Sequence, residues 1–167
     1  MNATADQRCR ILVADDDDEV LEAFRRAFSP DPDDAEHRLL EELEQGLFGN
    51  SSPARQDPMS FDIVTCTQGQ QALEAVREAL QRQCPFKIIF LDIRMPPGMD
   101  GVRTAQRIRD LDGNVTIVFI TAYSDESFDT VAGLVPPPAK LLFFNKPFLA
   151  VEFVGLASKL CGQSQLS

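Results

Sequence analysis

The chain has 167 residues, about the size of one domain, and 44% of them are apolar while 25% are charged. This composition is typical of a folded globular protein and excludes a disordered or fibrous one. Twenty-six acidic against sixteen basic residues give a net charge of −10, which repels nucleic acid and anionic membrane surfaces. We therefore expect no direct contact with nucleic acid and none with a membrane.

The cysteines and the N-terminus indicate a cytoplasmic protein. Four cysteines are scattered along the chain without a Cys-x-x-Cys pair, and a single histidine, His37, is present to complete a metal site: Cys9, Cys66, Cys84 and Cys161. We expect reduced thiols packed as small apolar residues rather than disulfides. No apolar run approaches the roughly 18 residues that span a bilayer, and the polar N-terminus lacks the apolar stretch of a secretion signal.

The first half of the chain predicts two pairs of a strand and a helix. A short apolar run, Arg10–Ala14, predicts a strand that stops at four consecutive aspartates, Asp15 to Asp18. Apolar residues at helical spacing then predict a helix through residues 20–28. A second strand is predicted at Phe61–Cys66, followed by a helix through residues 69–80.

The second half continues the same alternation. The third strand, Phe86–Leu91, is the most apolar, is typical of a buried parallel strand, and delivers Asp92 at its C-terminal end. The remaining predicted elements are a helix through residues 102–111, a strand at Val115–Ile120, a helix at 125–134, a strand at Lys140–Phe144 and a helix through 151–160. Five repeats of strand and helix predict an α/β fold, a parallel sheet with helices on both faces.

One stretch does not fit this alternation. About thirty residues, roughly 31–60, separate the first helix from the second strand, where a handful would suffice. Leucines on one side and glutamates on the other predict an amphipathic helix at Asp34–Gln45, which covers apolar surface or contacts a partner or a second copy of the chain. We expect one domain over residues 1–161 including this insertion, with a tail or the start of a linker at 162–167.

Chemically versatile side chains stand where the predicted strands end. They are Asp15, Asp16, Asp92, Thr121 and Lys146. In a sheet of this kind ligands bind beyond the C-terminal ends of the strands, so we expect these side chains to converge. Three crowded carboxylates repel one another unless a cation neutralises them, and hard oxygen ligands in that number suit Mg²⁺.

A hydroxyl and an ammonium group facing the same cation are what a phosphoryl group needs, and an aspartate can itself be the nucleophile that accepts it. Asp92 is the best-placed nucleophile, because it ends the most buried central strand. Asp17 or Asp18, in contrast, is expected only to cap the first helix.

Four segments together resemble the signatures of response-regulator receiver domains, in the family's order. They are Ile11-Leu-Val-Ala-Asp-Asp16, Leu91-Asp-Ile-Arg-Met-Pro96 with Gly98-Met-Asp-Gly101, Ile120-Thr-Ala-Tyr123 and Asn145-Lys-Pro-Phe148. The resemblance spans about residues 10–160 apart from the insertion. It implies a flavodoxin-like, doubly wound sheet of five strands in the order 2-1-3-4-5.

The resemblance also implies a role for each site residue. Asp92 is the phosphoacceptor, Thr121 the switch hydroxyl and Lys146 the phosphate-binding lysine. Phe143 occupies the position of the switch aromatic, and Lys146-Pro147 that of a cis peptide bond. The magnesium ligands come from the acidic pair, the phosphoacceptor and one backbone carbonyl: Asp15, Asp16, Asp92 and the carbonyl of Arg94.

By this resemblance the chain belongs to a two-component phosphorelay. A phosphohistidine on a sensor histidine kinase or a histidine phosphotransfer protein would supply the phosphoryl group, and the domain would catalyse only its own modification. The new charge would draw Thr121 and Lys146 inward, with Phe143 following, and so change an output surface. An effector domain in a longer chain and a homodimer are both compatible with the resemblance.

Three departures and two alternatives accompany this interpretation. The loop Met95–Gly101 is one residue longer than the common family form, three prolines replace a small turn before the fifth strand, and Phe143 cannot hydrogen-bond as a tyrosine would. The first alternative is a receiver-like docking module that no longer accepts phosphate. The second is a haloacid-dehalogenase-like phosphatase, which requires a second acid where this chain has Arg94.

Overall fold

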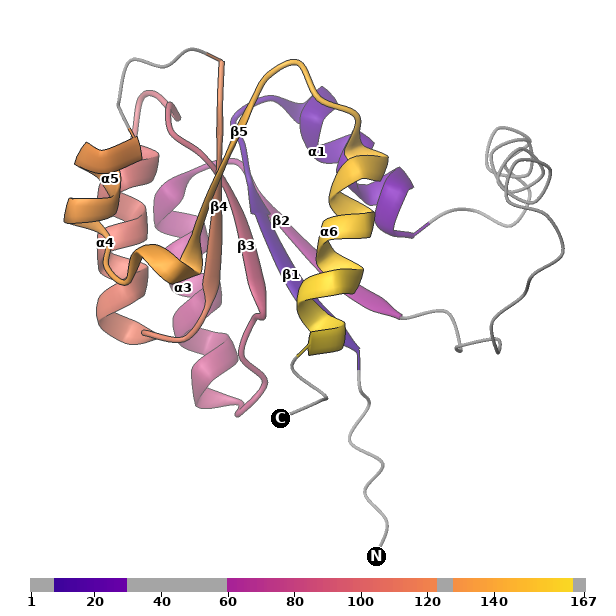
Figure 1. Cartoon of the computed structure of the whole chain (residues 1–167), viewed down its shortest axis with the longest axis horizontal. Helices are drawn as coiled ribbons and strands as arrows, with labels where there is room; N and C mark the ends of the chain where they lie inside the picture. Colours follow the sequence, from indigo (N-terminus) through magenta and orange to yellow (C-terminus); the bar gives the residue numbers. More distant parts are fainter. Residues whose placement is uncertain (1–7, 30–59, 123–127, 164–167) are drawn as a thin grey trace, which may run out of the picture.

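A computed structural model describes residues 8–29, 60–122 and 128–163 (Figure 1). Five parallel strands form one sheet in the order β2-β1-β3-β4-β5. The strands are β1 (Cys9–Ala14), β2 (Phe61–Cys66), β3 (Ile88–Asp92), β4 (Thr116–Thr121) and β5 (Leu141–Asn145). The predicted α/β fold and its strand order are therefore confirmed.

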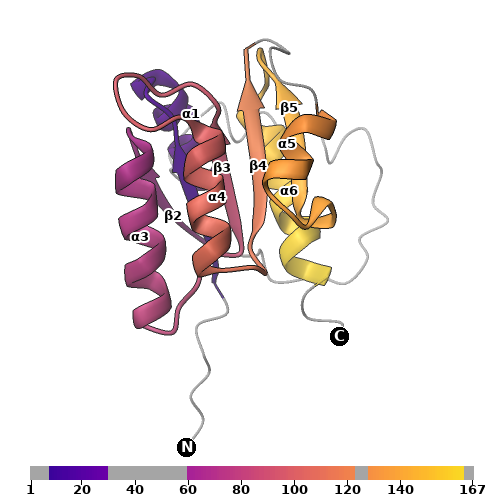
Figure 2. The ribbon, with the colours of Figure 1, turned by 90° about the vertical axis from the view of Figure 1, so that its left-hand side faces the viewer.

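Helices cover both faces of the sheet, as Figures 1 and 2 show. Apolar residues of α1 and α6 pack on one face, and those of α3, α4 and α5 pack on the other. The described helices are α1 (Asp18–Phe28), α3 (Gly69–Gln81), α4 (Gly101–Leu111), α5 (Phe128–Leu134) and α6 (Ala150–Gln163), with a short 3₁₀ helix η1 (Pro138–Lys140). None of the helices in the described ranges is long and apolar enough to cross a membrane.

Strand β3 is the centre of the molecule. All five of its residues are buried, and alternate side chains enter opposite cores: Ile88 and Phe90 face α1 and α6, whereas Ile89 and Leu91 face α3 and α4. Burial on both faces explains why this run is continuously apolar rather than alternating. The same packing fixes Asp92 at the end of the strand.

Strand β2 has the predicted bounds, and the other four strands differ from the predicted ones by one or two residues at their ends. Strand β3 begins at Ile88 instead of Phe86, and β4 extends through Thr121. The insertion at about 31–60, its helix at Asp34–Gln45 and the first residues of the helix predicted at 125–134 lie outside the described residues. Within the described part, α5 ends at Leu134 as the three following prolines predict.

The expectation of four reduced cysteines is wrong for one pair. Cys9, at the start of β1, and Cys161, in the last turn of α6, form a disulfide with their Cα atoms 6.2 Å apart. Cys66 is a buried free thiol and Cys84 an exposed one. The pair is separated by 152 residues, so spacing along the chain cannot reveal it; only the packing of α6 over β1 brings the two together.

This disulfide ties the first strand to the last helix, and its loss should destabilise the domain. Cys9→Ser is expected to lower the free energy of unfolding by about 2–4 kcal/mol in buffer without reductant, because a cross-link between distant residues restricts the unfolded chain. Urea unfolding followed by circular dichroism measures the change. Cys84→Ser is the matched control and should leave the urea midpoint of unfolding unchanged. If the wild type had the same midpoint with and without reductant, the expectation would be contradicted.

Candidate functional site

The C-terminal ends of two strands bring together the acidic side chains singled out in the sequence. Asp15 and Asp16 follow β1 and Asp92 ends β3, and carboxylate oxygens of the three lie within 4.8 Å of one another. Asp15 is 1% exposed and Asp92 is 7% exposed, whereas Asp16 is open to solvent. Two buried carboxylates and one exposed carboxylate thus form an acidic pocket at this edge of the sheet, with Asp16 on its solvent side.

Lys146 closes the buried side of this pocket. It follows β5, and its Nζ lies 3.1 Å from Asp15 Oδ2 and 3.4 Å from Asp92 Oδ2. Its backbone N–H donates to the carbonyl of Thr121, the last residue of β4, at 2.8 Å. The peptide bond between Lys146 and Pro147 is cis, at the position where the family resemblance places one. One ammonium group therefore binds two of the three carboxylates.

Backbone amides orient the same two buried carboxylates by donating to the oxygen of each that Lys146 does not contact. The N–H of Asp17 donates to Asp15 Oδ1 at 2.9 Å, and the N–H of Arg94 donates to Asp92 Oδ1 at 3.2 Å. Asp17 is the N-cap of α1, and its side chain accepts from the N–H of Glu19. Asp17 has the capping role expected for it, and the two buried carboxylates are fixed before any ligand arrives.

Burial and the closeness of other charges shift the pKa values of two groups in the site. Burial, with a smaller contribution from the charge on Asp92, raises the pKa of Asp15 from 3.8 to about 6, against the opposing effects of the Asp17 N–H and of Lys146. Burial by itself would lower the pKa of Lys146, but its contacts with Asp15 and Asp92 outweigh that effect and raise it. The pocket holds more negative charge than one lysine balances, as a cation-binding site requires.

The raised pKa of Asp15 predicts a pH dependence of stability. In metal-free buffer between about pH 4 and 6, folded Asp15 keeps a proton that the unfolded chain, with a carboxyl pKa near 3.8, has released. The free energy of unfolding should therefore fall as the pH rises through this range. Asp15→Asn should remove about 2 kcal/mol of that fall.

Urea unfolding in a chelating buffer at the two ends of this range measures the effect. Asp110→Asn, which changes an exposed carboxylate of α4, is the control and should keep the wild-type slope. Parallel pH profiles of wild type and Asp15→Asn would show that Asp15 has no raised pKa.

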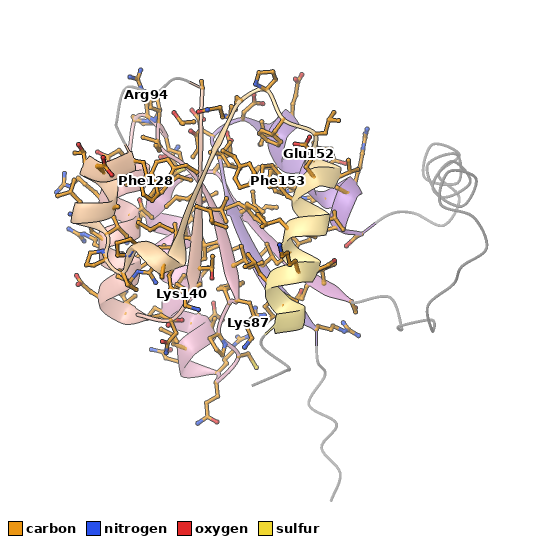
Figure 3. The ribbon with its side chains drawn as sticks, in the orientation of Figure 1. Lys87, Arg94, Phe128, Lys140, Glu152 and Phe153 are labelled. Atoms are coloured by element: carbon orange, nitrogen blue, oxygen red, sulfur yellow. A yellow bond between two sulfur atoms is a disulfide. The ribbon has the colours of Figure 1, made fainter. Side chains whose placement is uncertain are left out.

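The two remaining site residues of the sequence analysis lie along β4 and β5. Thr121 is half-buried at the end of β4, in register with Asn145. The ring of Phe143 packs between Phe119, 5.1 Å away, and Phe128 of α5, 5.2 Å away. Phe128 is the first residue of α5, and although it contacts β5 it is 46% exposed (Figure 3). An aromatic row thus leads from the core to the surface of α5.

Arg94 belongs to the loop that joins β3 to α4. Figure 3 shows it beyond the carboxyl ends of the strands, at the end of the sheet opposite Lys87 and Lys140. The loop is closed at its far end by the N–H of Gly101, which donates to the carbonyl of Ile93 at 2.7 Å. This places the backbone that follows Asp92 along the rim of the acidic pocket.

Sequence reasoning missed two residues next to this loop. The side-chain amide of Gln68 donates to the carbonyl of Pro96 at 3.3 Å, and Gly69 begins α3 where a Cβ would lie 2.1 Å from Thr104 Oγ1. Both follow the end of β2. Ligands of parallel sheets bind at the carboxyl ends of the strands, so the segment after β2 was also a candidate. It carries no charged side chain that would have indicated a role.

The residues present fit a magnesium ion. Mg²⁺ prefers oxygen ligands and keeps several waters, so a few carboxylates on an open rim suffice. Asp15, Asp16 and Asp92 supply such oxygens, and the open side next to Asp16 leaves room for the waters.

Comparisons with known proteins agree with this geometry. The response regulator receiver domain family matches residues 54–148, more than half of the chain. This chain belongs to the response regulator receiver domain family.

Two curated relatives are regulators longer than this chain. The transcriptional regulatory protein ZraR of Escherichia coli (strain K12) is 34% identical over 64 residues, which cover 38% of this chain and 13% of ZraR. PrrA of Mycobacterium tuberculosis, also a transcriptional regulatory protein, is 30% identical over 151 residues, which cover 90% of this chain and 49% of PrrA. This chain thus spans half or less of the length of these relatives.

A solved structure shares the fold. The CheX-CheY-BeF3-Mg²⁺ complex from Borrelia burgdorferi contains a chain that matches with a TM-score of 0.59 and 18% identity, over 90% of this chain and 87% of that one. At this identity the likeness concerns the fold alone.

Proposed function

We propose that this chain is a phosphoacceptor domain that takes a phosphoryl group onto Asp92. The observation that carries the proposal is the position of the Asp92 carboxylate. It is buried at the end of the central strand, 3.4 Å from the ammonium of Lys146, and beside two further carboxylates that can hold a metal. A carboxylate so placed is a fixed nucleophile next to the charges that a phosphoryl group requires.

In the proposed reaction an oxygen of Asp92 attacks the phosphorus of a phosphohistidine. The phosphorus–nitrogen bond breaks, its electron pair stays on the imidazole nitrogen, and that nitrogen takes up a proton. The ammonium of Lys146 and the hydroxyl of Thr121 are the groups of this chain that would bind the phosphoryl oxygens. No substrate other than its own Asp92 is proposed, so the domain acts on itself.

Magnesium would be held by the acidic pocket and by one backbone carbonyl of the adjoining loop: Asp15, Asp16, Asp92 and the carbonyl of Arg94. When bound, it would neutralise charge on the phosphoryl oxygens. The approach of the three carboxylates to one another supports this assignment.

The proposed switch begins at the same residues. A phosphoryl group on Asp92 would draw Thr121 and Lys146 toward it, and Phe143, which follows Phe119 in the aromatic row, would move with the end of β4. Since Phe143 also contacts Phe128, the movement would reach the exposed side of α5. A changed surface over α5 and β5 would then be the signal.

The partners belong to the same proposal. A sensor histidine kinase or a histidine phosphotransfer protein would donate the phosphoryl group. Because the relatives ZraR and PrrA are longer than the aligned region, an effector domain attached to this receiver in a longer chain is proposed as the recipient of the signal.

The proposal is tested by incubating the chain with acetyl phosphate and Mg²⁺ and measuring its intact mass. The expected result is the addition of one phosphoryl group, dependent on Mg²⁺ and prevented when a chelator is present. A wild-type chain that stays unmodified with both acetyl phosphate and beryllofluoride would contradict the proposal and favour a phosphate-independent docking module.

A further inference from the structure

The loop between β3 and α4 is anchored at both ends, but its middle has little support. At the start, the N–H of Arg94 binds Asp92 and the side chain of Met95 is 1% exposed. At the end, the N–H of Gly101 binds the carbonyl of Ile93. Between these anchors Pro96, Pro97 and Gly98 are exposed, and neither proline has an N–H to donate.

Gln68 supplies the missing support from the neighbouring loop. Its Nε2 donates to the carbonyl of Pro96 at 3.3 Å, which is the one side-chain hydrogen bond to the main chain of residues 95–99 in the described part of the chain. Gln68 is also the N-cap residue of α3, yet its side chain makes no capping bond. Its side chain is turned toward the loop instead.

The packing around Gln68 is close. A Cβ at Gly98 would lie 2.6 Å from Gln68 Oε1, and a Cβ at Gly69 would lie 3.1 Å from the carbonyl oxygen of Met99. Glycines on both sides thus allow the loop to approach the start of α3 with the amide of Gln68 between them. The middle of the loop is thus held by a residue that follows β2 rather than by a residue of its own strand.

We propose that Gln68 is a positioning residue for the metal-binding loop: by holding Pro96 it fixes the main chain between Asp92 and Pro96, which includes the carbonyl of Arg94. This rests on the proposed function, in which that carbonyl is a magnesium ligand. A loop that is already ordered does not lose conformational freedom when the ion binds, so its affinity is higher. Gln68 does not touch the reacting atoms and is therefore not a catalytic residue.

The proposal predicts a separation of two measured quantities. Gln68→Met keeps the length of the side chain and removes the donor, so the dissociation constant for Mg²⁺ should rise about threefold to tenfold, the range expected for one hydrogen bond. The rate of phosphorylation by acetyl phosphate at saturating Mg²⁺ should remain that of the wild type. Calorimetric titration of the 167-residue chain with Mg²⁺ gives the first quantity, and intact mass over time gives the second.

A matched control is available two residues further along the chain. Gln70→Met, also on α3, removes a side-chain amide bond of the same length, 3.3 Å, made to Glu74 and away from the loop. It should leave the affinity for Mg²⁺ unchanged. This variant separates the loss of one exposed amide bond on α3 from the loss of the bond to Pro96.

The outcomes distinguish a failure of the proposed function from a failure of the positioning role of Gln68. A wild type that neither binds Mg²⁺ nor takes phosphate overturns the proposed function and this inference with it. If the wild type does both and Gln68→Met binds Mg²⁺ as tightly, the positioning role alone is wrong. Equal losses of affinity in Gln68→Met and Gln70→Met, or a fall in the saturating rate, would likewise overturn it and indicate a general structural role.

Discussion

Asp92→Asn is expected to abolish phosphorylation by acetyl phosphate, to below about 1% of the wild-type level, because the amide that replaces the carboxylate is not a nucleophile. The effect is this large because no equivalent acceptor lies beside Asp92 among the residues that the structure describes. Asp15 is held by Lys146 and by the N–H of Asp17, and Asp16 faces solvent. Intact mass after incubation with acetyl phosphate and Mg²⁺ measures the loss.

The variant should remain folded. The amide still accepts the bond from the N–H of Arg94, and removing one of three crowded carboxylates relieves repulsion, so the unfolding midpoint should not fall. Asp110→Asn, an exposed position on α4, is the control and should be modified like the wild type. Undiminished labelling of Asp92→Asn would mean that another residue accepts the phosphoryl group.

Of the substitutions that add a single methyl group to this site, Gly101→Ala is expected to lower the free energy of unfolding most. A Cβ at Gly101 would lie 2.1 Å from the carbonyl oxygen of Asp92 and 2.7 Å from the Cα of Ile93. Both are main-chain atoms at the end of β3, so relief requires the strand end and α4 to separate. We expect the free energy of unfolding to fall by about 3 kcal/mol and phosphorylation to slow, since the shift moves Asp92 itself.

The matched control for this prediction is expected to change the free energy of unfolding in the opposite direction. Gly155 lies within α6 with no atom near the position of a Cβ, so Gly155→Ala should raise the free energy of unfolding by about 0.5–1 kcal/mol. Urea unfolding of both variants provides the comparison. Equal stabilities of Gly101→Ala and wild type would contradict the close approach of α4 to β3.

The fold could be predicted from the sequence because the patterns of apolar side chains in strands and in helices differ clearly along this chain. The run from Ile88 to Leu91 is buried on both faces, and only a central parallel strand explains such a run. Strand ends were less predictable. Phe86 and Lys87 continue the pattern of β3, but a pattern of side chains does not show which backbone groups pair.

For the candidate site, the sequence indicated which side chains meet but not how they are held. That Asp15, Asp92 and Lys146 lie together follows from the rule that parallel strands end at one edge. Contacts between loops follow no such rule, so the bond from Gln68 to Pro96 could be found only in three dimensions. The disulfide between Cys9 and Cys161 was missed because the two residues are far apart in the sequence and only the packing of α6 over β1 brings them together.

The identity of the modified residue tests the central claim most directly. An aspartyl phosphate is an acyl phosphate, and borohydride reduces it to an alcohol that survives digestion, so mass spectrometry of the peptides locates the acceptor. After treatment with acetyl phosphate and Mg²⁺, the reduced residue is expected at Asp92 and nowhere else. A reduced residue at Asp15 or Asp16, or phosphorylated chain that yields no reduced residue, would contradict the account.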